Sequence, residues 1–311
     1  MTSLGRVLIV ANPVAGTISN DQVWQLVTRC KRTHDVSVRW TTGPGDAFAI
    51  AQSAVDSPLY TVLFSVGGDG TAREVAAGLA TAWNGLAPVA MMIVPAGTAN
   101  SNYHTLWGEL SWQDAVDEVL AKPSTRLRHL DLARVAELDR LVLAGACSGF
   151  PPQAIHESRA ITDWAGPARY HKALVNLAHR YVPYPGRVVV DGAEVHSGPT
   201  LFANVGGSRY RGGYFELLPH SVTDDGLLDV CVVGGEYSAG DVMRLSRKGA
   251  HVSQPGVVYA RGRQIQIERT DGASMWFEHD GEVLVNPRSS VTLDVVPGAV
   301  PMLVGEGPAV S

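Results

Sequence analysis

The first 122 residues alternate short apolar runs with helical patterns, and this alternation constrains the fold more than any other feature of the sequence. The apolar runs cover residues 6–13, 36–42, 60–68 and 89–97. Each run is short, apolar throughout and followed by turn residues, which is typical of a buried parallel strand. Strands that alternate with helices in this way predict a doubly wound α/β domain.

The intervening segments show the periodicity and end signals of helices. Apolar residues recur at helical spacing over residues 75–83, which predicts a helix with one buried face. Thr71 and Glu74 have the spacing of a capping box that would open this helix. A further helix is expected to begin at Ser111, with Asp114 as its capping partner.

The pattern changes after about residue 125, where short strands follow one another between Gly and Asp-Gly turns. Residues 187–195 read as a hairpin in which Asp191 and Gly192 take the two positive-φ turn positions. Residues 264–268 alternate polar and apolar side chains, as a half-buried strand does. A single helical stretch, residues 166–182, interrupts this part. The second half is therefore expected to be an antiparallel β-sandwich.

Composition excludes several classes of protein. The net charge is −5 at pH 7, so no overall basic surface indicates a nucleic-acid partner. Cys30, Cys147 and Cys231 are widely spaced in apolar surroundings, which favours buried free thiols over a disulfide framework or a zinc site. The sequence contains neither a signal-peptide pattern nor an apolar run of roughly 18 residues. We therefore expect a cytoplasmic protein, with peripheral membrane association left open.

Polar and glycine-rich loops follow all four apolar runs of the first half. They cover residues 12–16, 41–43, 67–71 and 95–100. The carboxyl ends of strands in an open α/β sheet meet at one edge, where ligands bind, so these loops predict a nucleotide or phosphate site. The third loop, Gly-Gly-Asp-Gly-Thr, adds a carboxylate that would repel a phosphate. That acid is understandable if Asp69 approaches a Mg²⁺ ion that accompanies the phosphates.

Common alternatives to this site are missing from the sequence. No P-loop pattern occurs, and no G-x-G-x-x-G follows the first run. The chain also lacks a G-x-S-x-G nucleophile elbow and an H-E-x-x-H zinc motif, despite its 10 histidines. These absences argue against a P-loop enzyme, an α/β-hydrolase and a zinc protease.

Five motifs in order along the chain resemble the diacylglycerol kinase catalytic-domain family, which includes bacterial lipid kinases and the sphingosine and ceramide kinases. They are NPVAG at 12–16, GGDGT at 67–71, PAGTAN at 95–100, LPHSVTDDGLLDV at 218–230 and HDGE at 279–282. The Gly-Gly-Asp-Gly-Thr loop alone is shared with NAD kinases and, in variant form, with phosphofructokinases. The later motifs make the combination more specific to the lipid kinases.

The resemblance implies an ATP-dependent lipid kinase that phosphorylates a hydroxyl of diacylglycerol, a sphingoid base or a related lipid at a membrane surface. It implies a nucleotide domain of the NAD kinase and phosphofructokinase type at residues 1–125, completed by a strand at 290–305. A β-sandwich domain for the lipid would occupy residues 126–289. ATP and Mg²⁺ are the expected cofactors, no nucleic acid is expected as a partner, and a homodimer is left open.

The resemblance also assigns residues to roles. Asp225, with the backbone carbonyls of Val222 and Leu227, would hold Mg²⁺ in the second domain. Asp280 or Glu282 would accept the proton of the lipid hydroxyl, with Asp69 as a further catalytic acid near the nucleotide. The residues expected at the ATP site are Asn12, Thr41, Gly67, Gly68, Asp69, Gly70, Thr71, Ala72, Arg73, Thr98 and Asn100.

The chain departs from the family pattern at two loop positions. Ser101 stands where relatives carry an acid after Asn100, and Ala15 stands where a serine is common. Asp131 could complete a rebuilt carboxylate network or could be a turn acid, and Ser101 could instead cap the segment that follows it. Two rival functions therefore stay open, an NAD kinase and a family member that binds nucleotide or lipid with little catalysis.

Overall fold

The computed structural model describes residues 5–16, 18–57, 59–82, 89–122, 126–164, 166–284 and 288–305. Contacts divide the chain into two compact units. Unit 1 comprises Met1–Leu130 and Gly298–Ser311, and unit 2 comprises Asp131–Pro297. The sequence had suggested a division at residues 125 and 126, with residues 290–305 returning to the first domain. Among the described residues, no helix is both long and apolar enough to cross a lipid bilayer.

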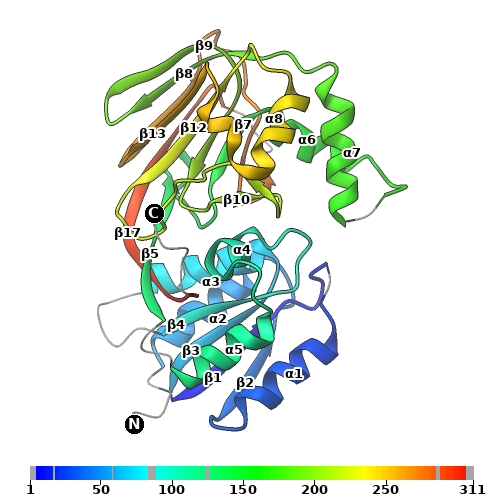
Figure 1. Ribbon diagram of the computed structural model, residues 1–311. Helices are drawn as coiled ribbons and strands as arrows, with labels where there is room; N and C mark the ends of the chain where they lie inside the picture. Colours follow the sequence, from blue (N-terminus) through cyan, green and yellow to red (C-terminus); the bar gives the residue numbers. More distant parts are fainter. Residues whose placement is uncertain are drawn as a thin grey trace. The chain divides into compact units, whose positions relative to one another are not determined.

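Unit 1 is built on a parallel sheet with the strand order β2-β1-β3-β4 (Figure 1). Its strands are β1 (Arg6–Ala11), β2 (Val36–Trp40), β3 (Tyr60–Gly67) and β4 (Ala90–Pro95). All of these pairings are parallel, which confirms the doubly wound α/β architecture. The end of β17 (Ser290–Leu303) adds a further parallel pairing, Met302 with Met91 of β4.

Helices cover both faces of this sheet, because the strand order reverses direction after β2 (Figure 1). α1 contacts α5 on one face, and α2 contacts α3 on the other. The capping pair predicted at α5 is confirmed, since Ser111 Oγ accepts a hydrogen bond from Asp114 N at 3.2 Å. The helices are α1 (Asn20–Cys30), α2 (Asp46–Val55), α3 (Asp69–Ala82), α4 (Ser101–Trp107) and α5 (Trp112–Ala121).

The predicted capping box at α3 is wrong. The helix begins at Asp69, two residues before Thr71, so Glu74 is not at the third helical position from a cap. Both carboxylate oxygens of Glu74 accept instead from the backbone N–H of Gly45, at 3.0 and 3.1 Å. A tertiary contact with the loop after β2 has replaced the local one. Trp83, at the end of the predicted helical pattern, lies outside the described residues.

Unit 2 is rich in antiparallel strands, as expected from its Gly and Asp-Gly turns. The hairpin of β8 and β9 turns at Asp191 and Gly192, with φ values of 48° and 84°, which confirms the predicted turn. The strands are β5 (Leu127–Val135), β6 (Arg140–Val142), β7 (Ala146–Gly149), β8 (Tyr184–Val190), β9 (Ala193–Gly206), β10 (Tyr210–Arg211), β11 (Phe215–Glu216), β12 (Leu228–Gly234), β13 (Val257–Gly262), β14 (Gln264–Arg269), β15 (Phe277–His279) and β16 (Glu282–Val283).

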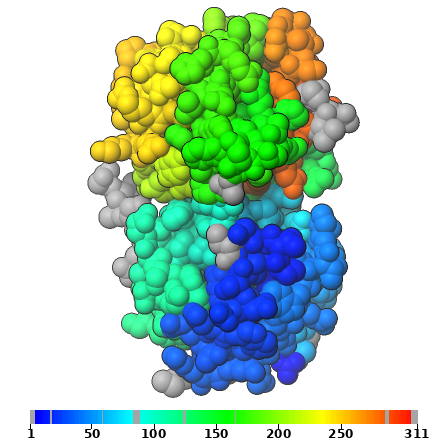
Figure 2. All heavy atoms as spheres, turned by 90° about the vertical axis from the view of Figure 1, so that its right-hand side faces the viewer, coloured from blue at the N-terminus to red at the C-terminus, as the bar shows by residue number. Residues whose placement is uncertain are grey.

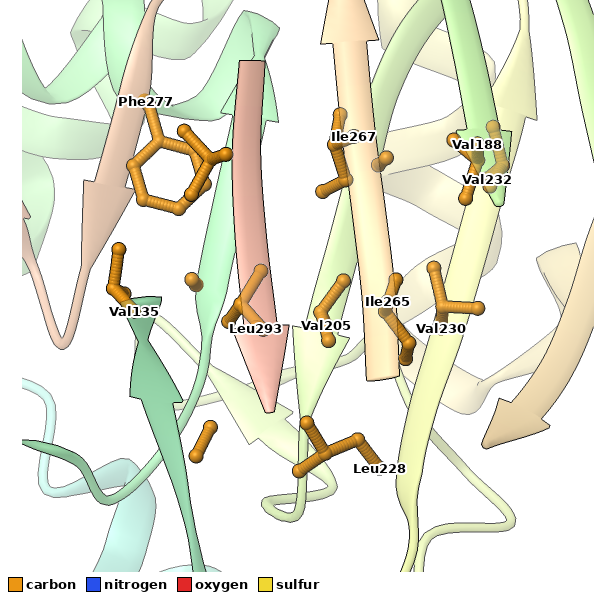
Figure 3. Packing of buried hydrophobic residues seen from close by; sticks show 14 of the residues in the cluster. Val135, Val188, Val205, Leu228, Val230, Val232, Ile265, Ile267, Phe277 and Leu293 are labelled. Atoms are coloured by element: carbon orange, nitrogen blue, oxygen red, sulfur yellow. The ribbon is translucent and has the colours of Figure 1, made fainter. Parts of the chain in front are cut away.

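The core of unit 2 is formed by side chains from strands far apart in the sequence. Figure 3 shows Val188 of β8, Val230 of β12, Ile265 of β14 and Leu293 of β17 packed together, and each is completely buried. Burying a side chain of this size stabilises a fold by roughly 1.5–3 kcal/mol. Because side chains alternate along a strand, the neighbours of these residues face the opposite side of the sheet.

That opposite side packs against helices, two of which the sequence did not predict. α7 (Gly166–Ala178) lies within the expected stretch, but α6 (Phe150–Ser158) and α8 (Ala239–Leu245) were missed. α6 follows Gly149 directly and has proline in its first turn, where proline fits a helix without losing a hydrogen bond. The three cysteines are free and buried, as expected.

Candidate active site

The loops after the strands of unit 1 gather at one edge because the strands end at the same level. Ala11 of β1 pairs with Trp40 of β2 and with Val66 of β3. Val66 in turn pairs with Val94 of β4. All four strands run in the same direction, so their carboxyl ends lie side by side. The polar loops predicted to form a ligand site are therefore neighbours in the structure.

Asn12 joins the first of these loops to the third. Its Nδ2 donates to Thr71 Oγ1 at 3.0 Å, and its backbone N–H donates to Val66 O at 3.0 Å. Its Oδ1 accepts from the N–H of Val14 at 3.1 Å, which closes an Asx turn. Both polar atoms of the Asn12 side chain thus bond within the site, and Asn12 positions the loop around Thr71.

The glycines of the third and fourth loops allow the two backbones to touch. A Cβ on Gly97 would lie 2.3 Å from Gly68 Cα, closer than real atoms approach. The N–H of Ala96 donates to Gly67 O at 2.8 Å across the same contact. Any side chain at Gly97 would separate the loops, so the glycine is needed for this packing.

Asp69 connects the third loop to the start of α4. Its Oδ1 accepts from both the backbone N–H and the Nδ2 of Asn102, each at 3.0 Å. Its Oδ2 accepts from the N–H of Ser101 at 3.1 Å. A helix leaves its first N–H groups without partners, and here a carboxylate from another loop satisfies them. The acid in the glycine loop is thus a tertiary helix cap.

The first turn of α3 has room for an anion. A Cβ built on Gly70 would meet no atom within 4 Å, unlike one on Gly67, which would collide with Thr71. The N–H groups of a helix's first turn point along the axis beyond its amino end and carry the positive end of its dipole. α3 has 14 residues, so this dipole is well developed. The residues present therefore fit a phosphate group at the open side of Gly70.

The remaining residues expected at the ATP site lie on the same loops and on α3. Thr41 is buried, and its N–H donates to Ala11 O at 2.9 Å. Ala72 and Arg73 are buried within α3, and Thr98 is exposed. Asn100 closes its own loop, with Oδ1 accepting from Gly97 N and Nδ2 donating to Gly97 O, both at 2.9 Å.

Sequence reasoning missed Asp46, the first residue of α2. Its Oδ2 accepts from the N–H and hydroxyl of Thr42, at 2.7 and 2.5 Å, and from Gly43 N at 3.1 Å. The Thr42 hydrogen bonds lower the pKa of this exposed carboxyl from its ordinary value. Asp46 thereby fixes the loop after β2. The spacing of three residues between Gly43 and Asp46 was the sequence signal for this contact.

In unit 2, Asp280 occupies the turn between β15 and β16. Asp280 and Gly281 have φ values of 48° and 84°, the same turn geometry as at Asp191 and Gly192. The Asp280 carboxylate accepts three backbone hydrogen bonds, from Leu143, Ala144 and Gly145 N, at 2.9, 2.7 and 3.3 Å. Asp280 is buried, whereas Glu282 is exposed.

A buried ion pair lies beside this turn and was not predicted. Arg211 pairs with Glu278, whose Oε2 also accepts from Gly281 N at 2.7 Å. Burial lowers the pKa of Arg211, but the carboxylates of Glu278 and Asp280 outweigh this and raise it above its usual value. Glu278 directly precedes the HDGE motif and lies two residues before Asp280, which was the sequence signal. The pair holds the turn in place.

Asp225, expected to bind a metal ion, has protein partners instead. Its Oδ1 accepts from Leu227 N at 3.1 Å, and its Oδ2 forms an ion pair with Arg261. Asp131 lies at the same loop, with Oδ2 accepting from Gly226 N at 2.6 Å. A guanidinium at hydrogen-bond distance would repel a divalent ion, so these residues do not fit Mg²⁺. Within the described ranges, no group of three or more His, Cys, Asp and Glu residues is arranged to hold a metal.

Asp229 lies next to this loop and is completely buried. Its Oδ1 accepts from the Tyr259 hydroxyl at 2.8 Å. Burial raises the pKa of Asp229 to about 6, although the hydrogen bond from Tyr259 partly opposes the rise. The carboxylates of Asp225 and Asp229 are thus stabilised by two donors from β13, Arg261 and Tyr259.

Comparison with known proteins covers both units. Residues 6–135 match the diacylglycerol kinase catalytic domain, and residues 146–304 match the YegS C-terminal NAD kinase beta sandwich-like domain. A Pseudomonas fluorescens protein named "Probable lipid kinase YegS-like" is 30% identical over 253 residues, which are 80% of each chain. A Staphylococcus epidermidis diacylglycerol kinase is 26% identical over 282 residues, covering 89% of this chain and 85% of that protein.

A crystal structure of a Bacillus anthracis diacylglycerol kinase shares the fold, with a TM-score of 0.73. The two sequences are 20% identical, and the match covers 98% of this chain and 99% of that one. The two domain matches lie in the order predicted from the motifs and together span nearly all of the chain. The protein belongs to the diacylglycerol kinase catalytic-domain family of lipid kinases, with a YegS-type C-terminal domain.

Proposed function

We propose that this lipid kinase transfers the γ-phosphoryl group of ATP to a hydroxyl of diacylglycerol, a sphingoid base or a related lipid. The observation that carries the proposal is the open first turn of α3 at Gly70, flanked by loops that Asn12 and Asp69 hold together. Phosphoryl transfer depends on positioning and on charge stabilisation, and such a cradle supplies both. Family membership identifies the acceptor as a lipid in kind.

The residues of unit 1 have distinct proposed roles. Backbone N–H groups of the first turn of α3, around Gly70 and Thr71, would bind phosphate oxygens. Asn12 would keep Thr71 in position through their hydrogen bond of 3.0 Å. Asp69 would hold the start of α4 beside this turn. Mg²⁺ arriving with ATP would neutralise phosphate charge. Its ligands would be phosphate oxygens, waters and the carboxylate of Asp69.

The proton of the lipid hydroxyl would pass to Asp280 or Glu282. A general base must have a lone pair within reach of the hydroxyl. Asp280 already accepts three N–H hydrogen bonds, which leave one lone-pair position on Oδ2. Glu282 is exposed and more accessible to a substrate. Both residues stay candidates, and their variants separate them.

We also propose that α7 and its neighbours contact the membrane that holds the lipid. Trp164, Val175 and Val182 are 49%, 42% and 79% exposed, and a depression of about 400 Å³ is lined by Trp164, Val175 and Tyr214 among others. Figure 2 shows this face, with α7 in green beside the yellow segment that includes α8. The exposed basic residues on and next to α7 and α8 are Arg169, Arg180, Arg244, Arg247 and Lys248. Arg180 pairs with Glu157 and Arg244 with Asp241. Apolar side chains among basic ones suit an anionic lipid surface.

Two rival functions make different predictions. An NAD kinase would transfer phosphate to NAD, and a binding protein would be stabilised by ATP or lipid without turnover. The test is transfer of radiolabel from γ-labelled ATP to a panel of diacylglycerol, sphingoid bases and related lipids with Mg²⁺, with NAD assayed in parallel. Labelled lipid supports the proposal. Labelled NAD, or stabilisation by ATP without any labelled product, would replace it with one of the rivals.

A further inference from the structure

Arg261 bridges two carboxylates at the loop between β11 and β12. It lies on β13 directly opposite Asp229 of β12, and its Nε is 3.3 Å from Asp229 Oδ1. The other side of the same guanidinium forms the ion pair with Asp225. Leu228 and Val230 point into the core in Figure 3, so Asp229 between them faces the other side of the strand. One planar cation thus joins a strand to a loop.

The loop has a second anchor that does not involve charge pairing. The N–H of Asp131 donates to Thr223 O at 2.8 Å, and Asp131 Oδ2 accepts from Gly226 N at 2.6 Å. These bonds fix the backbone on both sides of Asp225. The Asp225 side chain itself closes a turn onto Leu227 N at 3.1 Å. The loop conformation around Asp225 is therefore defined by protein groups on both sides of it.

Three carboxylates gather at this position, so a nearby cation stabilises it. Asp131 is buried and Asp229 is completely buried, and Asp225, which is exposed, adds a third carboxylate at the same loop. Burial strengthens the repulsion between like charges, as at Asp131 and Asp229, unless a counter-ion is present. In an oxygen-rich loop that counter-ion could be Mg²⁺ or Ca²⁺. Here Arg261 already supplies a positive charge, fixed in place by its strand.

We propose that the Arg261 guanidinium takes the place of a divalent cation at this loop, so that unit 2 is folded and stable without bound metal. Mg²⁺ would then reach the enzyme with ATP and would not be needed at this loop. A guanidinium suits the role because its planar donors reach two carboxylates at once and it stays charged at any ordinary pH. Since it is tethered, its occupancy does not depend on the free Mg²⁺ concentration.

The test measures thermal unfolding of the full chain without nucleotide or lipid, so it is independent of the kinase activity. The wild-type unfolding midpoint should be the same in EDTA and in millimolar Mg²⁺ or Ca²⁺. Arg261→Ala should lower the midpoint in EDTA by about 4 °C or more. Millimolar Mg²⁺ or Ca²⁺ should then restore part of that loss, because the carboxylates regain a counter-ion. Arg261→Lys should fall between the two.

Arg263 provides a matched control, since it is exposed and lies two residues further along the chain. Arg263→Ala should leave the midpoint insensitive to divalent ions. Should Arg261→Ala not fold, Mn²⁺ binding followed by water relaxation decides the question on wild type and Arg261→Gln. The wild type should bind no Mn²⁺ tightly, and Arg261→Gln should gain a site. A wild-type midpoint that rises with Mg²⁺, tight Mn²⁺ binding by wild type, or variants that ignore divalent ions would overturn the proposal.

Discussion

Asp69 caps helix α4 through Asn102, accepting hydrogen bonds from its backbone N–H and its side-chain amide, each at 3.0 Å. The third bond, from Ser101 N at 3.1 Å, completes the cap. Asp69 is also the first residue of α3, so its carboxylate links the amino ends of two helices. The glycine loop and the loop after β4 are consequently a single structural unit.

Replacing this acid should therefore affect stability and nucleotide binding together. Asp69→Asn presents an amide nitrogen to N–H donors, and we expect a loss of about 1–2 kcal/mol in the free energy of unfolding. The KM for ATP should rise and kcat should fall, because the phosphate cradle loosens. Denaturant unfolding and steady-state kinetics measure both effects.

Ser111→Ala is the control for a simple loss of cap in the same unit. Ser111 is exposed and caps α5 through Asp114 N. Its loss should cost about 1 kcal/mol with unchanged kinetics. If Asp69→Asn also left the KM for ATP and kcat unchanged, Asp69 would have only a structural role.

Ser101→Asp tests whether the cleft lacks a carboxylate. Ser101 is buried at the first position of α4, next to Asp69. A carboxylate there gains a few tenths of a kcal/mol from the helix dipole. It also faces the Asp69 carboxylate in a partly buried setting, where the repulsion between the two charges exceeds that gain. We expect lower stability and lower kinase activity for Ser101→Asp, and a near-wild-type result for the neutral Ser101→Asn. Higher activity in Ser101→Asp would show that the acid is missing from an otherwise working site.

The α/β rhythm and the hairpin at Asp191 were predictable because they rest on local signals, the periodicity of buried strands and the φ preference of Asp-Gly. The start of α8 was also predictable from a local signal. Ser238 and Asp241 form a capping pair of the same kind as Ser111 and Asp114, the pair that predicted α5. The signal for α8 was therefore available in the sequence. The edge of the sheet was also predictable, since parallel strands of similar length align their carboxyl ends.

The partners of the charged residues could not be predicted. Glu74 binds Gly45 from a distance of 29 positions in the sequence, and Asp225 meets Arg261 from 36. The local spacing of Thr71 and Glu74 predicted a capping box, but Glu74 accepts a tertiary hydrogen bond from Gly45 N instead. The approach of Asp69 to a metal ion stays a prediction. Its contact with the start of α4 could not be predicted, because nothing in the sequence showed that α4 would begin beside it.

Variants of the β15–β16 turn should separate a structural acid from a catalytic one. Asp280→Asn replaces one carboxylate oxygen by an amide nitrogen that cannot accept, so at least one of the three N–H donors loses its acceptor. We expect a loss of about 1–3 kcal/mol in the free energy of unfolding. Glu282→Gln should leave stability unchanged, because the side chain is exposed. Whichever residue is the base should show a kcat lower by roughly 10²–10⁴-fold with little change in the KM for ATP.

Asp191→Asn controls for the loss of an acid in the same kind of turn. Asp191 accepts from Arg263 N and Gln264 N at 2.9 and 2.8 Å, as Asp280 accepts from its own neighbours. The variant should lose stability and keep kcat. Normal turnover in both Asp280→Asn and Glu282→Gln would exclude this turn as the source of the base.

His251 should make the protein sensitive to mild acid. It is buried, its Nε2 lies 3.3 Å from Leu217 O, and burial lowers its pKa to about 4, although the Leu217 hydrogen bond partly opposes the shift. Above pH 6.5 or so, the ring is neutral in the folded and unfolded states, and its contribution does not vary with pH. Between about pH 6.5 and 4 the unfolded state binds a proton that the folded state does not. The free energy of unfolding should therefore decrease as the pH is lowered from about 6.5 to 4, by up to about 1.4 kcal/mol per pH unit.

His251→Gln keeps a donor for Leu217 and removes the titration. The free energy of unfolding, measured by urea denaturation from pH 7 to pH 4, should depend less steeply on pH in this variant than in wild type. His179→Gln, at an exposed position, should leave the wild-type slope unchanged. Equal slopes for wild type and His251→Gln would show that the buried ring does not control acid stability.

The α7 face should bind anionic membranes through apolar insertion as well as charge. Wild-type protein should sediment with phosphatidylglycerol vesicles more than with pure phosphatidylcholine, and high salt should weaken this binding. The double variant Trp164→Ala, Val182→Ser removes two exposed apolar side chains, and we expect roughly tenfold weaker binding or more.

Trp24, which is 60% exposed on α1, supplies the control variant Trp24→Ala, which should bind as wild type does. The double variant should lose activity on vesicle-bound lipid but keep it on a soluble short-chain lipid, because the catalytic groups are untouched. Unchanged vesicle binding in the double variant, or an equal loss in Trp24→Ala, would place the membrane contact elsewhere.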